Sequence, residues 1–247
     1  YAAISRGFIS EKLEVSLGFN VTGNDYSDEF YSPLKQFSPR LAASFNLTDR
    51  WSINASVGRY YQLPPLTVLG YEQAGEFVNK ENDIRPVSAD HFVLGVSYIT
   101  DIESKISLEG YFKNYNSYPF LTRDSVNLAN VGGDFGVVGN EPAISDGKGR
   151  TYGVEFLYQQ KLFKGFYGTV SYTLGVSEFT DAEGNYIPSS WDTRHILNIS
   201  TGYRFGNNWE VGVSYRFQSQ LPSTPFDPAS SLVQNWDINN GAIPDYS

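Results

Sequence analysis

The sequence contains no cysteine among its 247 residues, which excludes disulfide bonds and metal sites built from thiolates. It also lacks any run of eighteen apolar residues, so we expect no transmembrane helix. Methionine is absent even at the first position, and no charged and apolar leader opens the chain. We therefore expect a mature or internal segment of a longer product.

Charged residues are scarce, at 18%, and the formal net charge is -9. This acidic balance argues against a nucleic-acid partner. Aromatic residues make up 16% of the chain, yet the mean hydropathy is only -0.33. Many aromatics with modest hydropathy are typical of a transmembrane β-barrel, because half of each of its strands is polar.

A strict alternation of side chains is the main signal, and residues 51–61 show it best. Trp51, Ile53 and Val57 share one face of the predicted strand with Tyr61, while small polar residues occupy the other face. Trp51 and Tyr61 are ten residues apart. At ~3.3 Å per residue and a tilt of ~40° this spans roughly 25 Å, the height of the apolar band of an outer-membrane barrel.

The same pattern recurs along the chain. It predicts nine strands and a weaker one, within residues 13–22, 40–47, 51–61, 92–98, 106–113, 151–159, 166–176, 197–205, 209–218 and, more weakly, 1–9. We expect a lipid-facing aromatic girdle made of Trp51, Tyr61, Phe92, Tyr98, Tyr158, Trp209 and Phe217. The predicted fold is all-β: a transmembrane antiparallel up-and-down β-barrel segment that takes in residues 1–247 as a single domain.

Short and long connections alternate between these strands. The short ones lie near residues 10–11, 48–50, 100–103, 163–165 and 206–208. The long ones cover about 24–37, 63–89, 119–149, 180–193 and 221–247. Outer-membrane barrels have short periplasmic turns and long extracellular loops, so the pattern predicts the bacterial outer membrane as the location.

Four strings resemble the TonB-dependent outer-membrane receptors. Residues 37–51 (FSPRLAASFNLTDRW) are similar to that family's strand, periplasmic turn and strand, in which SPR starts a descending strand. Residues 57–65 (VGRYYQLPP) resemble the following ascending strand and loop start, and residues 85–92 (RPVSADHF) resemble the return from a long loop. Residues 191–198 (WDTRHILN) are similar to the entry of a late descending strand. The resemblance covers essentially the whole chain.

The resemblance implies a 22-stranded barrel plugged by an N-terminal domain, of which about ten strands are present here. It also implies import of a scarce nutrient, driven by the TonB complex through the plug of the parent protein. The plug and the terminal strands have no counterpart in this sequence. Iron-siderophore, cobalamin, oligosaccharide and peptide receptors share this wall, and siderophore uptake is the family-level expectation.

No motif indicates an enzyme, a cofactor or a metal site. The two histidines, His91 and His195, have no ligand-spaced partners, and we interpret them as strand-entry residues that bond locally near the outer rim. The glycine-rich residues 132–139 precede no predicted helix, and residues 181–185 lack the pattern of a calcium loop. We therefore expect no catalytic residue, cofactor or metal.

Eight charged residues fall on the polar face of the strands: Glu14, Arg40, Glu109, Lys113, Glu155, Arg204, Glu210 and Arg216. Charges that face lipid cost ~2–4 kcal/mol at mid-membrane, which places these in the lumen. The main interpretation is that they pair across strands or with the plug. The alternative is that some bind the nutrient, together with neighbouring polar side chains. The predicted ligand-binding residues are Tyr111, Lys113, Tyr115, Arg216 and Gln218. Arg59 breaks the apolar face, and we expect it to snorkel towards lipid headgroups.

Two other classes of protein fit the pattern. A small passive porin would close its barrel with these ten strands alone. A soluble β-sheet adhesin or binding module would instead bury its apolar face against another sheet. A segment of a larger barrel has two open edges, so we expect it to pair with the remaining strands or to self-associate.

Overall fold

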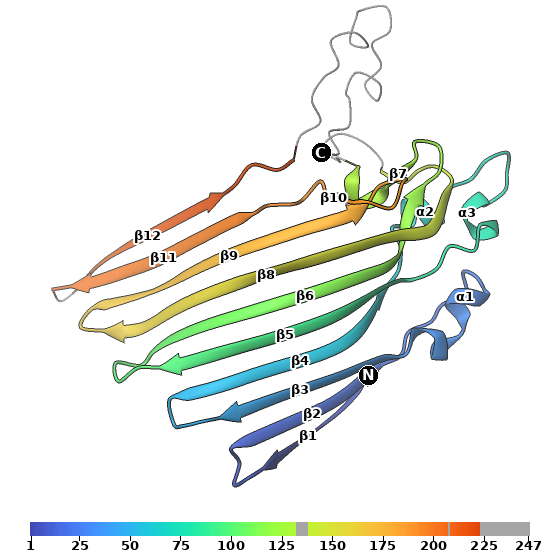
Figure 1. The fold of residues 1–247 in the computed structure, drawn as a ribbon. Coiled ribbons are helices and arrows are strands. Elements are labelled where there is room, and N and C mark those ends of the chain that lie inside the picture. The colour runs from blue at the N-terminus through green and yellow to red at the C-terminus, as the bar shows by residue number, and fades with distance from the viewer. Residues whose placement is uncertain (132–137, 207, 223–247) are drawn as a thin grey trace, which may run out of the picture.

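The computed structural model describes residues 1–131, 138–206 and 208–222, and it is a single antiparallel sheet (Figure 1). Ten long strands follow one another in the order β1-β2-β3-β4-β5-β6-β8-β9-β11-β12, while β7 pairs with β6 and β10 with β9. Each strand therefore pairs with its neighbours in sequence, as hairpin connections require. No helix among the described residues is long and apolar enough to span a membrane.

The alternating pattern located all ten long strands, including the weak first one. Their bounds are β1 Ala2–Phe8, β2 Leu13–Asn20, β3 Ser38–Asn46, β4 Trp51–Gln62, β5 Val87–Ile99, β6 Ser104–Leu121, β8 Ala143–Phe163, β9 Phe166–Thr180, β11 His195–Phe205 and β12 Trp209–Gln218. The short elements are β7 Val126–Asn127, β10 Tyr186–Pro188, the helices α1 Asp28–Tyr31, α2 Leu66–Leu69 and α3 Val78–Glu81, and 3₁₀ turns at Pro33–Gln36 and Leu128–Asn130.

The long loop predicted over residues 119–149 is shorter in the structure, and both of its predicted bounds are wrong. Strand β6 continues to Leu121 and β8 begins at Ala143, so the connection covers only residues 122–142. The alternation is lost there because the register shifts between Tyr115 and Tyr118 and again before Phe120. Ser117, with a φ of 56°, stands at the irregularity. Such a bulge changes which side chains share a face, and a strict period-two pattern cannot follow it.

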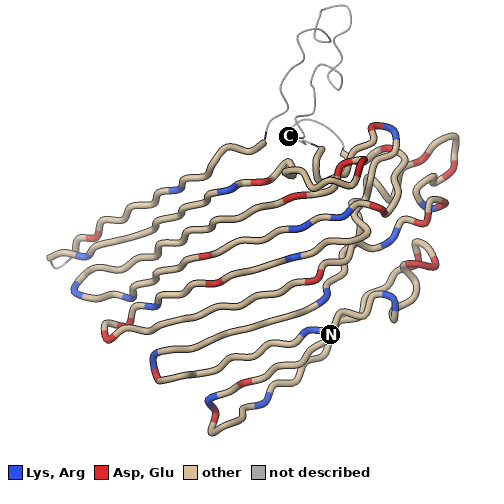
Figure 2. The backbone as a smooth tube through the Cα atoms, viewed as in Figure 1, with Lys and Arg blue, Asp and Glu red and all other residues tan. Residues whose placement is uncertain are grey.

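The register places the apolar side chains of all strands on one face. Val57, Phe92 and Phe112, for example, are direct partners on β4, β5 and β6. This face is uncovered: Leu94 is 62% exposed and Val213 57% exposed. A soluble sheet would bury such a face, whereas a sheet in a membrane presents it to lipid. Figure 2 shows that charged residues gather at the hairpin turns and at the opposite end of the sheet, with few along the strands between.

The sheet is open, which contradicts both alternative classes. Strands β1 and β12 end the path and do not pair with each other, so the ten strands form no small closed porin. The described residues form one sheet only, so no second sheet packs on the apolar face as an adhesin would require. The wall of a larger barrel is the arrangement that remains.

The strands are staggered as barrel closure demands. Leu13 follows the first turn directly, and successive partners across the sheet lead from it to Phe217 on β12. Phe217 lies eight residues beyond Trp209, where β12 begins after its own turn. A row of register partners therefore runs obliquely, rising away from the turns as it crosses the sheet.

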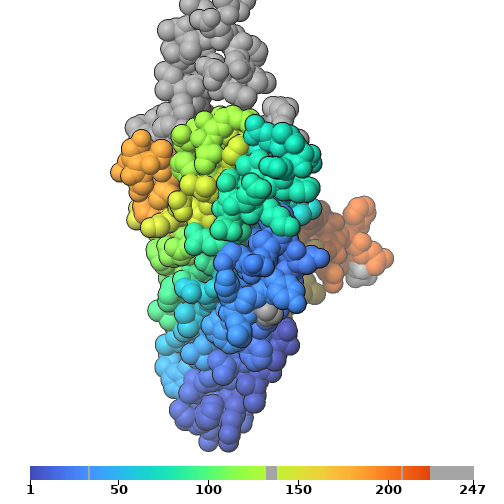
Figure 3. Space-filling view, turned by 90° about the vertical axis from the view of Figure 1, so that its right-hand side faces the viewer, coloured from blue at the N-terminus to red at the C-terminus, as the bar shows by residue number. Residues whose placement is uncertain are grey.

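The described parts of three long connections pack together into what we call the cap, formed by residues 21–37, 63–86, 122–131 and 138–142. Phe30 in the first connection and Val68 and Ile84 in the second are fully buried. They cluster with Leu121 and Leu128. Figure 3 shows these segments side by side at the end of the sheet. The sequence patterns placed no core in these connections.

One buried polar side chain ties two parts of the cap together. The Asn79 side-chain amide donates to the carbonyl oxygens of Val68 (2.7 Å) and Glu141 (2.9 Å). Its side-chain oxygen accepts a hydrogen bond from the Ala143 amide at 2.7 Å. Asn79 is fully buried, so these bonds satisfy backbone groups that water does not reach.

Candidate functional site on the polar face

Four neighbouring strands bring basic and aromatic side chains together on the polar face. Arg40 on β3, Gly58 on β4, His91 on β5 and Lys113 on β6 are successive register partners. Tyr60 lies among them: its ring centroid is 4.3 Å from the Arg40 guanidinium and 4.3 Å from the His91 ring. We call Arg40, Tyr60, His91 and Lys113 the basic cluster.

Glycine at position 58 makes room for the basic cluster. A Cβ there would lie 3.1 Å from Arg40 Cγ and 3.2 Å from Tyr60 Cε2. Both distances are tighter than ordinary contacts, so a larger residue would push the guanidinium and the phenol ring apart. The packing of Arg40 against Tyr60 thus depends on the absence of a side chain between them.

The donors of the basic cluster are not all used. Arg40 Nε is buried and has no hydrogen-bond partner within residues 1–131, 138–206 and 208–222. Lys113 Nζ lies 5.3 Å from the ring centroid of Tyr111, a cation–π distance. A guanidinium with an unused donor, packed on a phenol ring and in the same register row as a lysine, is suited to binding an anionic group.

An acidic row lies on the same face, nearer to the periplasmic turns. Glu109 and Glu155 are direct partners across β6 and β8, and the same row continues to Glu14 on β2. Of the eight charges predicted in the lumen, Arg204 and Glu210 form an ion pair, with Nε and Oε2 2.9 Å apart. The other six have no ion-pair partner in the part of the chain that the structure describes.

The structure separates the five predicted ligand-binding residues into two groups. Tyr111, Lys113 and Tyr115 form one stripe on β6, on the polar face. Arg216 and Gln218 lie on β12, with a hydrogen bond of 3.3 Å between their side chains. Strands β8, β9 and β11 lie between the two groups. Ligand binding by these residues stays a prediction, and only the first group adjoins the basic cluster.

Tyr115 also has a packing role that the sequence did not reveal. Its ring centroid is 5.5 Å from that of Phe179, which is 2% exposed. Gly149 leaves the space for the Phe179 ring, since a Cβ at position 149 would lie 2.3 Å from Phe179 Cε1. A substitution of Tyr115 would therefore disturb packing as well as any contact with a ligand.

The predicted girdle residues all lie on the apolar face. Trp51 and Tyr98 pack against each other across β4 and β5 near the turns, with ring centroids 4.6 Å apart. The others on this face by register are Tyr61, Phe92, Tyr158, Trp209 and Phe217. The placement fits a membrane-facing girdle. Contact of these particular residues with lipid stays a prediction.

The sequence missed the role of one histidine and identified the other. His195 Nδ1 lies 2.8 Å from the Tyr172 hydroxyl, the local bond expected of a strand-entry residue. His91 instead packs against the Tyr60 ring within the basic cluster, with the two ring planes tilted by 31°. Strand parity places His91 and Tyr60 on the polar face, but only the register between β4 and β5 brings their rings together.

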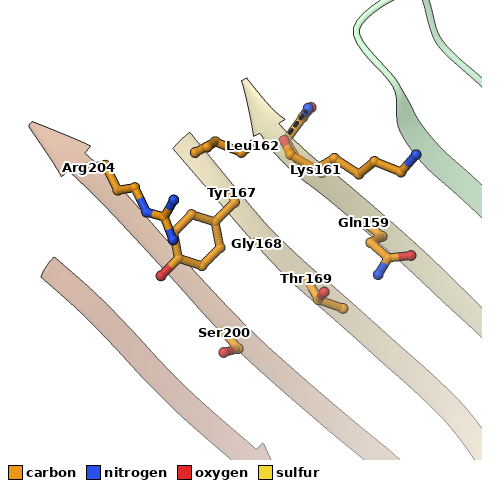
Figure 4. A pocket seen from close by; sticks show the side chains of 9 residues that line it. Gln159, Lys161, Leu162, Tyr167, Gly168, Thr169, Ser200 and Arg204 are labelled. Carbon is orange, nitrogen blue, oxygen red and sulfur yellow. Dashed lines mark hydrogen bonds between the residues drawn. The ribbon is translucent and has the colours of Figure 1, made fainter. Parts of the chain in front are cut away.

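A polar hollow of about 500 Å³ lies near the periplasmic ends of β8, β9 and β11 (Figure 4). Both of its charged lining residues are already ion-paired, Lys161 with Glu103 and Arg204 with Glu210. The Tyr167 hydroxyl and the Arg204 guanidinium both hydrogen-bond to Glu210. Gly202 provides the seat of the Tyr167 ring, since a Cβ there would lie 2.3 Å from it. The basic cluster, with an unused donor, is therefore the stronger candidate for a ligand site.

The sequence model of the family described as "TonB dependent receptor-like, beta-barrel" matches residues 4–247. The chain therefore belongs to the TonB-dependent receptors of the outer membrane, which are transporters and not enzymes. No curated protein is significantly similar to it in sequence.

Solved structures share the fold at low identity. The ferripyoverdine receptor of Pseudomonas aeruginosa has a TM-score of 0.64 and 17% identity over 91% of this chain and 28% of its own. The alcaligin outer-membrane receptor FauA of Bordetella pertussis has a TM-score of 0.59 and 16% identity over 88% of this chain and 36% of its own. The copper transporter OprC has a TM-score of 0.58 and 13% identity, over 87% and 33%. The chain thus spans about a third of each of these receptors.

Proposed function

We propose that the chain forms part of the wall of a larger barrel that imports a scarce nutrient with energy from the TonB complex. Membership of the family and the open ten-strand sheet support this proposal. The remaining strands of the parent barrel would pair with β1 and β12, because unpaired strand edges are not stable in a membrane.

The basic cluster favours a ligand with an anionic part, such as a ferric chelate of the siderophore type. Arg40 packs on the Tyr60 ring and Lys113 lies in the same register row, so two cations on the polar face attract an anion, and both keep donors for it. Two of the similar structures are receptors for siderophores, alcaligin and pyoverdine. This cluster is the single observation on which the choice of ligand rests.

A bare copper ion, the cargo named for OprC, is a weaker candidate for this segment. Copper sites favour Cys, Met and His ligands, and the chain has no cysteine or methionine and only two histidines. The described residues contain no group of three or more His, Asp or Glu placed to hold a metal ion.

The test uses the complete receptor and two substitutions on the same face of β6. Lys113→Gln removes a charge from the basic cluster, whereas Lys105→Gln removes one near the periplasmic end of the strand. We expect Lys113→Gln to weaken uptake and binding of a labelled ferric siderophore at least ten-fold, and Lys105→Gln to leave both unchanged. Equal effects of the two would contradict a role for the cluster. Absence of uptake for every ferric chelate tried, by the unsubstituted receptor, would contradict siderophore import.

A further inference from the structure

A row of polar and charged side chains crosses the apolar face near its outer end. Arg59, Asp90, Asn114, Arg150 and Glu178 are successive register partners on β4, β5, β6, β8 and β9, and we call them the outer row. The next row towards the periplasmic turns consists of Val57, Phe92, Phe112, Tyr152 and Val176. Most of the surface therefore changes from aliphatic or aromatic to polar or charged within one step along the strands.

Two ion pairs hold the charges of the outer row in place. Arg59 forms a bidentate pair with Asp90, with Nε–Oδ1 at 2.6 Å and Nη2–Oδ2 at 2.7 Å. Arg150 Nε lies 2.7 Å from Glu178 Oε2, and its guanidinium is 4.3 Å from the ring centroid of Tyr186. Arg59, for which we expected snorkelling, is thus held by an ion pair across the strands. Arg150 is held in the same way on the same face.

The height of the outer row matches the headgroup region. Arg59 is eight residues from Trp51, which at ~3.3 Å per residue and a tilt of ~40° is roughly 20 Å, near the top of an apolar band of ~25 Å. Rows rise away from the turns as they cross the sheet, so Arg150 lies farther out than Arg59. Charges at this level stand among lipid headgroups.

Both arginines keep donors for a further partner. A guanidinium has five N–H groups, and in the described part of the chain Arg59 uses two of them and Arg150 one. The Arg59 side chain is 47% exposed and that of Arg150 39%. Planar N–H pairs that are positioned by a carboxylate and open to the headgroup level fit the oxygen atoms of a phosphate.

We propose that the outer row is a binding surface for the phosphate headgroups of outer-leaflet lipid, with Arg59 and Arg150 as the contacts. The acidic partners orient the two guanidinium groups and reduce the cost of placing them beside hydrocarbon. Binding here would hold β4 to β9 at a fixed depth in the membrane. The proposal rests on membrane insertion and on no particular nutrient.

The experiment measures lipid binding to the complete receptor, purified in a non-ionic detergent. Native mass spectrometry would follow a titration with diphosphorylated lipid A, with dephosphorylated lipid A as the acyl-matched control. We expect Arg59→Gln combined with Arg150→Gln to weaken binding of the phosphorylated lipid at least ten-fold and to leave the control lipid unaffected. Arg204→Gln removes an arginine that is also ion-paired, but on the polar face, and should bind lipid as the unsubstituted receptor does.

Three outcomes would overturn the proposal. Unchanged binding by the double Gln variant would remove the two arginines as contacts, and an equal loss in Arg204→Gln would show a general charge effect. Displacement of the lipid by millimolar inorganic phosphate would indicate a free-anion site and no lipid surface. If the Gln variant does not fold, Arg59→Lys with Arg150→Lys keeps both charges but loses the planar N–H pairs, and it should still bind at least three-fold more weakly. The experiment measures lipid binding and not uptake. Its result therefore stays valid even if the proposed nutrient import is wrong.

Discussion

Glu109 on β6 and Glu155 on β8 stand directly opposite each other on the polar face, with no ion-pair partner among the described residues. Two carboxylates in this position repel each other across the strands. A wall that served only its own stability would not keep such a pair. The acidic row therefore carries negative charge that the described part of the wall does not neutralise.

Replacing one of these carboxylates should stabilise the barrel. We expect Glu155→Gln to raise the free energy of unfolding by about 0.2–1 kcal/mol, because it removes a like-charge contact across the strands. The urea midpoint of the folded band on gels would measure this. Glu14→Gln is the matched control, since Glu14 lies in the same row but opposite Ser44. A loss of stability in Glu155→Gln would mean that Glu155 already pairs with a cation.

Loss of Asn79 should open the cap and leave the sheet folded. Asn79→Ala removes the partners of three backbone groups, each of which costs about 1–3 kcal/mol when buried and unpaired. We expect amide hydrogen exchange in residues 66–86 to become at least ten-fold faster, with unchanged exchange in β4 and β5. Asn82→Ala, which removes one bond of 3.1 Å to Ala143, should have a smaller effect. Unchanged exchange in Asn79→Ala would contradict its role.

The cap should depend on pH through Glu141. Burial, with the nearby charge of Asp124, raises the pKa of the Glu141 carboxyl above its ordinary value, and Oε2 has no partner in the described part of the chain. The folded cap therefore favours the protonated acid. Its stability is greatest below the ordinary carboxyl pKa of about 4.3 and falls as pH rises through the raised value.

Glu141→Gln tests this sign directly. It removes the cost of a buried charge, so amide exchange in the cap should be slower than in the unsubstituted receptor at pH 7. At about pH 3, where the acid is protonated in both states of the cap, the two proteins should exchange alike after correction for intrinsic rates. A variant that is less protected at pH 7 would show that the carboxylate has a partner.

Position 202, where the Tyr167 ring packs against a glycine, should not tolerate a side chain. Gly202→Ala would place a Cβ 2.3 Å from the Tyr167 ring, and we expect a loss of about 1–3 kcal/mol in unfolding free energy. Gly212 is the register partner of Gly202 on β12, and its nearest contact for a Cβ is at 3.8 Å. Gly212→Ala should change the urea midpoint much less. Equal effects of the two alanines would contradict the packing of Tyr167 on Gly202.

Strand positions and faces could be predicted from the sequence because a membrane wall needs one apolar and one polar face in every strand. In residues 51–62 the only charged residue on the apolar face is Arg59. Its ion pair with Asp90 in the outer row accounts for this exception. The pattern failed where backbone geometry leaves period two, as at Ser117. It also failed where residues distant in sequence meet, as Asn79 and Ala143 do in the cap.

The candidate site was predicted only in part for the same reason. Lys113 and Tyr111 could be placed on the polar face by parity. The placement of Arg40, Tyr60 and His91 next to Lys113 depends on the register of three strand pairs, which the composition of the strands does not fix.

The apparent mass of the native gene product in outer-membrane fractions, with and without boiling, tests the central claim most directly. This chain alone has a mass of 27.6 kDa for ten long strands. A barrel of 22 strands needs roughly 60 kDa, before any plug is added. We predict a heat-modifiable band of that size or larger. A heat-modifiable band near 27.6 kDa would contradict the account, because these ten strands would then form a barrel by themselves.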